Sequence, residues 1–90
     1  MDKAEIKSEI SRIDLKIKEL RGRVQSYQRL IELEKHEIAT FTTDPYEPYH
    51  TIDVYQNELE GYKMAFKEIC ERLQNLRKKR NELQREQNKY

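Results

Sequence analysis

Apolar residues recur along the first part of the chain at intervals that alternate between four and three. Starting from Ile6, this stepping reaches ten further positions, of which only Glu34 is charged. These positions are Ile10, Ile13, Ile17, Leu20, Val24, Tyr27, Ile31, Glu34, Ile38 and Phe41. A 3-4 rhythm sustained over about five heptads is typical of a coiled-coil seam. The pattern predicts a helix over residues 2–41.

A second series with the same stepping begins at Ile52. It continues through Tyr55, Leu59, Tyr62, Phe66, Ile69, Leu73, Leu76, Arg80, Leu83, Gln87 and Tyr90. Only its last third is interrupted by polar residues. The pattern predicts a second helix over residues 52–90.

The segment between the two series, residues 42–51, indicates a turn. Pro45 and Pro48 block helix continuation, and Asp44 before Pro45 is a good turn initiator. Thr51 is suited to be the N-cap of the second helix, because its hydroxyl can accept a hydrogen bond from a free amide of the first turn. The chain is therefore expected to reverse direction here.

The two seams also match each other in register. If the helices pack antiparallel, facing residues have numbers that add to a constant, and here that constant is 93. The pairs are Ile38 with Tyr55, Glu34 with Leu59, Ile31 with Tyr62, Tyr27 with Phe66, Val24 with Ile69, Leu20 with Leu73, Ile17 with Leu76 and Ile10 with Leu83. We predict an all-α fold, one long antiparallel helical hairpin (coiled coil) that forms a single domain over residues 1–90.

An alternative concerns the start of the second helix. The alternation of Ile52, Asp53, Val54 and Tyr55 also fits a β-strand, which would cap the coiled coil with a β-hairpin.

Two layers of the seam contain a charge, Glu34 opposite Leu59 and Arg80 opposite Ile13. We expect both side chains to reach outward to water while their stems stay in the seam. Such layers help to fix register. A second interpretation, that Glu34 or Arg80 meets a partner or ligand, stays open.

The positions that flank the seam on one side pair like charges with like. These pairs are Glu9 with Glu86, Lys16 with Lys79, Arg23 with Arg72, Leu30 with Ala65, and Glu37 with Glu58. Like-charged neighbours repel weakly, by about a few tenths of a kcal/mol, so they do not stabilise an isolated hairpin. A second hairpin packed antiparallel about Leu30 and Ala65 would instead bring the arginine pair of one copy onto the glutamate pair of the other.

The same flank supplies apolar or small residues that the seam does not need. Gly61 costs a helix about 1 kcal/mol relative to alanine, but a glycine lets another helix approach closely. We therefore predict a homodimer that forms a four-helix bundle, and higher oligomers stay open as an alternative. The predicted interface comprises Arg23, Leu30, Leu33, Glu37, Val54, Glu58, Gly61, Ala65 and Arg72.

Composition supports a helical interaction protein and gives no sign of an enzyme. The chain is 36% hydrophobic and 39% charged, which is close to coiled-coil usage. It has no signal-like or membrane-spanning stretch, and Cys70 is its single cysteine, so we expect a soluble cytoplasmic protein with no disulfide. No nucleophile, metal or nucleotide motif is present, and we expect no catalysis, metal or cofactor.

Charge is nevertheless polarised along the chain. From His36 to Tyr62 there are six acidic residues and no Lys or Arg, so the remainder carries +7 to reach the formal net charge of +1. The predicted turn adds tyrosines, which are favoured anchors in protein interfaces. We predict that this acidic, aromatic tip or the flanks bind a partner protein, as in an adaptor or inhibitor. The tip comprises Asp44, Tyr46, Glu47, Tyr49, His50 and Asp53.

Basic residues concentrate in the middle of the predicted rod. This basic belt comprises Arg12, Lys16, Arg23, Arg72, Arg77, Lys78, Lys79 and Arg80. A local positive excess of this kind can hold phosphates. The alternative function is therefore binding of an anionic ligand, nucleic acid or nucleotide, at the belt. Aromatic residues are scarce there, so base-specific recognition is not indicated.

Overall fold

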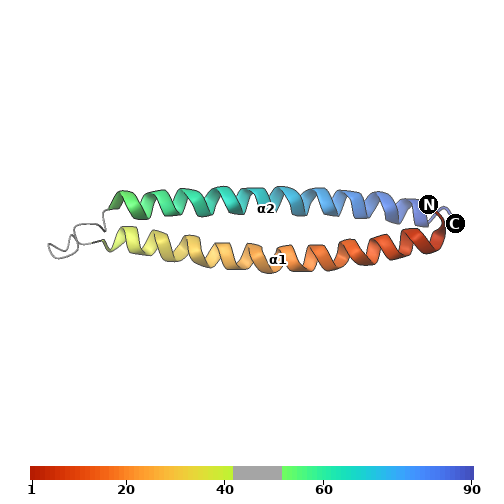
Figure 1. The fold of residues 1–90 in the computed structure, drawn as a ribbon, viewed down its shortest axis with the longest axis horizontal. Helices are drawn as coiled ribbons and strands as arrows, with labels where there is room; N and C mark the ends of the chain where they lie inside the picture. Colours follow the sequence, from red (N-terminus) through yellow and green to blue (C-terminus); the bar gives the residue numbers. More distant parts are fainter. Residues whose placement is uncertain (42–51) are drawn as a thin grey trace.

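Two long helices make up the structure, a computed structural model that describes residues 1–41 and 52–90. Helix α1 spans Lys3–Ala39 and helix α2 spans Ile52–Gln87. They run antiparallel and side by side, with both chain termini at the same end (Figure 1). At a rise of 1.5 Å per residue, the 37 residues of α1 extend for roughly 55 Å. The predicted all-α antiparallel hairpin is confirmed, and the strand alternative is wrong because Ile52 begins α2.

The helix ends are defined by short-range hydrogen bonds. Asp2 caps α1, its carboxylate accepting from the Glu5 amide at 2.8 Å. At the other end of α1, the Thr40 amide and hydroxyl both donate to the His36 carbonyl. The Tyr90 hydroxyl donates to the Met1 carbonyl at 2.9 Å, which ties the two termini together. Thr51, the predicted cap of α2, lies outside the described residues.

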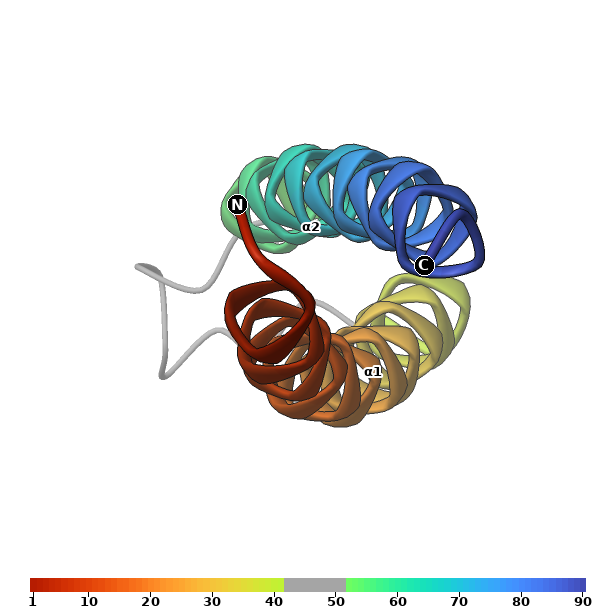
Figure 2. The same cartoon turned by 90° about the vertical axis from the view of Figure 1, so that its right-hand side faces the viewer.

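Burial is uneven along the seam. The best-buried apolar residues all belong to the half that contains the termini, which we call the stem half (residues 3–20 and 69–87). They are Ile6, Ile10, Ile13, Ile17, Leu20, Ile69, Leu73 and Leu83. In the tip half (residues 24–39 and 52–66), the apolar seam residues are half-buried or exposed. The two helices curve around each other along the rod (Figure 2).

Ile52 differs from its predicted place in the seam, because 39% of its surface is exposed. It is the first residue of α2, and α1 ends at Ala39, two residues before the position whose number would add to 93 with Ile52. The seam therefore opens at this end of the described helices.

Contacts between the helices lie near the predicted register, although none of the four is a predicted pair. Their residue numbers add to values between 88 and 96, on either side of the predicted 93. The contacts are Glu9 with Lys79, Asp14 with Arg80, Tyr27 with Tyr62, and Phe41 with Tyr55. Long side chains reach diagonally by about one turn, which accounts for the spread.

The two charged seam residues behave differently. Arg80 is half-buried and reaches outward, its Nε donating to Asp14 Oδ1 at 2.5 Å. Glu34 does not reach water as predicted, because only 8% of its surface is exposed. Its carboxyl group stays inside the seam beside other carboxyl groups.

Candidate functional site

The residues of the predicted interface lie along one flank of the hairpin, from its tip half to its middle. We call this flank the interface face. At its centre, Leu30, Leu33 and Val54 are 40%, 59% and 38% exposed. Ala65 is half-buried. The described residues leave this apolar surface partly exposed. By helix periodicity it is bordered by Arg23 and Arg72 toward the stem and by Glu37 and Glu58 toward the tip.

Gly61 lies within α2 on the same face. A Cβ atom added to it would meet nothing within 4 Å, and its backbone has no positive φ angle. Packing within the hairpin therefore does not require glycine at this position. Gly22, in α1, also has open space around it.

Three carboxyl groups come together at the acidic border of the interface face. Burial raises the pKa of Glu34 above its ordinary value, and the nearby charges of Glu58 and Glu37 raise it further. Its Oε2 atom is buried, with no hydrogen-bond partner among the described residues. The sequence identified Glu37 and Glu58 as neighbours but did not identify this cluster, although the antiparallel register places Glu58 one residue from the position facing Glu34.

A basic groove of about 570 Å³ lies between the helices on the same flank, toward the stem. Its floor is apolar, made by Ile13, Leu20 and Leu76. Five cationic and two anionic side chains line it, so the formal excess is three positive charges. The cationic residues are Arg12, Lys16, Arg23, Arg72 and Lys79, and the anionic residues are Glu9 and Glu19.

Some of the groove charges are already paired. Glu9 accepts from Arg12 at 2.7 Å and lies 3.7 Å from the Lys79 ammonium. Glu9 therefore contacts a lysine about two turns away from its predicted neighbour Glu86. These contacts, the Arg12 hydrogen bond first, lower the pKa of Glu9. Arg23 lies 3.4 Å from Glu19.

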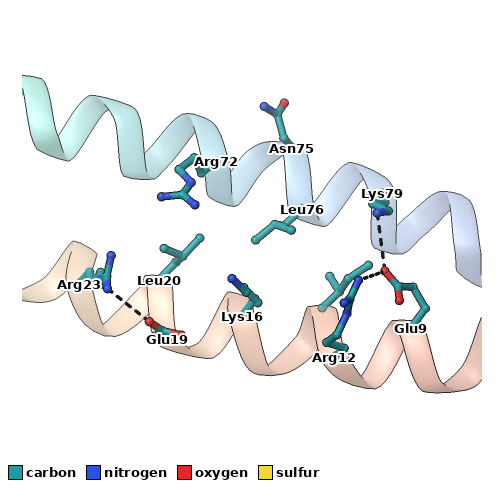
Figure 3. A pocket seen from close by; sticks show the side chains of 11 residues that line it. Glu9, Arg12, Lys16, Glu19, Leu20, Arg23, Arg72, Asn75, Leu76 and Lys79 are labelled. Atoms are coloured by element: carbon teal, nitrogen blue, oxygen red, sulfur yellow. Dashed lines mark hydrogen bonds and ion pairs between the residues drawn. The ribbon is translucent and has the colours of Figure 1, made fainter.

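Lys16 and Arg72 have no ion pair within the part of the chain that the structure describes. In Figure 3 both side chains extend into the space between the helices, Lys16 from α1 and Arg72 from α2. They are the unneutralised charges of the basic groove.

The predicted belt is distributed around the rod. Five of its eight residues line the basic groove. Arg77 and Arg80 line a separate hollow on the opposite flank, where Arg80 is bound to Asp14. Lys78 is exposed and lines neither.

Of the predicted tip, the structure describes one residue, Asp53, which is exposed in the first turn of α2. The other five, Asp44, Tyr46, Glu47, Tyr49 and His50, lie outside the described residues.

Residues 1–41 and 52–90 contain no group of three or more His, Cys, Asp or Glu placed to hold a metal ion. Neither described helix has the length and apolar character that a membrane span requires. Comparisons of the chain with protein families, with curated proteins and with solved structures find no match.

Proposed function

We propose that this chain is a non-enzymatic interaction protein that acts as a two-fold dimer of hairpins. The observation that carries the proposal is the interface face, where exposed Leu30, Leu33 and Val54 lie between an arginine pair and a glutamate pair. An uncovered apolar patch with polar borders is typical of a protein interaction surface.

The order of charges on this face favours a second copy of the same chain as its partner. Arg23 and Glu37 each lie seven residues from Leu30, and Arg72 and Glu58 each lie seven residues from Ala65. A two-fold axis beside Leu30 and Ala65 would therefore bring each arginine pair onto the glutamate pair of the other copy. A two-fold interface must be self-complementary in this way.

The uneven burial of the seam supports the same arrangement. The apolar seam residues of the stem half are largely buried within one hairpin, whereas those of the tip half stay partly exposed. A four-helix bundle formed by the tip halves would cover them.

Analytical ultracentrifugation tests the dimer with two matched leucine substitutions. Leu30→Glu places a charge in the proposed interface and is expected to give monomers. Leu15→Glu is the control, because Leu15 is also exposed, at 70%, but lies away from the interface face. Equal masses for wild type and both variants would contradict this dimer.

In this proposal, the dimer presents the acidic, aromatic tip or its flanks to a partner protein, as an adaptor or inhibitor does. Tyrosines bury much area at a small loss of conformational freedom, so Tyr46 and Tyr49 are the proposed anchors. A pull-down with the purified chain, read by mass spectrometry, should recover one protein with wild type and lose it with Tyr46→Ala/Tyr49→Ala. Recovery that is unaffected by this double substitution would exclude the tip.

A further inference from the structure

We propose that the basic groove is a binding site for phosphate groups, which adds a ligand to the interaction role proposed above. The groove collects five cationic side chains from both helices against two carboxylates, so its positive charges repel one another. Lys16 and Arg72 have no carboxylate partner among the described residues. An anion placed between them would remove this repulsion.

The carboxylates already in the groove do not saturate it. Glu9 and Glu19 leave an excess of three positive charges. The Arg23 and Glu19 side chains are 55% and 61% exposed, and the Arg12 side chain is 71% exposed. Ion pairs between exposed side chains are weak, so a phosphate can recruit Arg23 at little cost. Arg12 is itself exposed, although its partner Glu9 is only 18% exposed. Arginine also binds phosphate through two parallel hydrogen bonds.

The shape of the groove indicates the class of ligand. Its α1 lining runs from Glu9 to Arg23, which corresponds to roughly 20 Å along the helix. This length exceeds one phosphate group, so the ligand is a chain of phosphates, as in a nucleoside polyphosphate or a nucleic-acid backbone. No aromatic residue lines the groove, and stacking on bases is therefore not part of the recognition.

The test compares two double substitutions that change the net charge equally. Lys16→Glu/Lys79→Glu reverses two groove lysines. Lys18→Glu/Lys78→Glu is the matched control, because both lysines are exposed at a similar level of the rod and neither lines the groove. Binding of a fluorescein-labelled single-stranded oligonucleotide is followed by anisotropy at several salt concentrations. Far-UV circular dichroism checks that each variant remains helical.

We expect the groove variant to lose about tenfold or more in affinity and to show a shallower salt dependence, with the control close to wild type. If inorganic triphosphate displaces the labelled oligonucleotide, a short phosphate chain is sufficient for binding. If only unlabelled oligonucleotide displaces it, the groove binds a nucleic-acid backbone. Equal weakening by both double substitutions, or no binding by the wild type in about 0.1 M salt, would overturn the proposal.

Arg23 and Arg72 belong to both the groove and the interface face, so the test is built on lysines that only the groove contains. Lys16 and Lys79 are not residues of the interface face, and sedimentation of the same variants reports their oligomeric state. A chain that stays monomeric but binds the oligonucleotide through Lys16 and Lys79 would contradict the dimer and support the groove.

Discussion

The carboxyl group of Glu34 lies in surroundings that favour its neutral form. It is 8% exposed, and its pKa is raised first by burial and then by Glu58 and Glu37. The folded hairpin therefore keeps a proton that the unfolded chain releases near the ordinary value of 4.5. Because the unfolded state binds fewer protons in this range, the free energy of unfolding falls as pH rises from 4.5 through the raised pKa.

Replacing Glu34 with leucine should therefore stabilise the hairpin. Glu34→Leu removes a buried carboxyl group whose Oε2 atom has no partner among the described residues, and it completes the apolar seam. We therefore expect a gain of roughly 2 kcal/mol at neutral pH. The gain should be smaller near pH 4, where the wild-type carboxyl group is protonated in both states. Urea unfolding followed by circular dichroism at the two pH values measures the difference.

Glu32→Leu is the control, because Glu32 is exposed and its ion pair with Lys35 is a surface contact. Its effect on stability should be small and the same at both pH values. A gain from Glu34→Leu that does not change with pH would show that ionisation of Glu34 does not destabilise the fold.

The sequence placed Glu34 in the seam but did not predict its burial. Periodicity gives the side of a helix on which a residue lies, whereas the exposure of a long side chain depends on its diagonal neighbours in the other helix. Glu9 illustrates the same limit, because its contact with Lys79 crosses between helices at an offset from the predicted pairing. Residue-level electrostatics therefore required the structure.

At the level of the helices, Gly22 and Gly61 provide a natural comparison. Both are exposed and helical, and an added Cβ atom would meet nothing within 4 Å at either position. In the isolated hairpin each glycine only lowers helix stability. Only Gly61 lies on the interface face, where a second helix is proposed to pack closely.

Alanine at the two positions should therefore have different effects on association. Gly22→Ala and Gly61→Ala should each raise hairpin stability by up to about 1 kcal/mol when the chain is dilute. Gly61→Ala should also weaken the dimer several-fold, since the added methyl group keeps the second helix away. Thermal unfolding and sedimentation equilibrium measure the two effects. Dimer affinities that are the same for both variants would place the close contact elsewhere.

The two helices were predictable, because two heptad patterns that share one antiparallel register fit few folds other than a helical hairpin. Their ends were less predictable. Helix α1 ends at Ala39, two residues before the predicted Phe41, and α2 ends at Gln87, three before Tyr90. Apolar periodicity continues to those last positions, but the final turns have carbonyl groups without helical donors, so they depart from helix geometry.

For the whole molecule, one distribution of charge underlies both proposals. The flank that holds the interface face and the basic groove changes along the rod from acidic, through apolar, to basic. The sequence predicted this order, because it follows from heptad position alone. It could not predict the groove, because a groove is defined by where side chains from two helices leave space.

The self-complementary face can be tested by reversing each of its charged borders separately. In Arg23→Glu/Arg72→Glu both borders become acidic, and in Glu37→Arg/Glu58→Arg both become basic. Each variant alone would then place like charges in contact at both ends of the interface, which is costly in an association. We expect each to sediment as a monomer at concentrations where the wild type is a dimer.

Mixing the two variants should restore association as a heterodimer. Each border of one variant then meets the opposite charge on the other. The signs are exchanged at one border and as in the wild type at the other, so complementarity returns at both. Size-exclusion chromatography with light scattering, using a tag on one variant to capture the other, measures this directly. Dimers formed by either variant alone, or a mixture that stays monomeric, would show that the arginine and glutamate pairs do not meet across a two-fold axis. Recovery of a one-to-one complex only on mixing would support a two-fold arrangement in which they do meet.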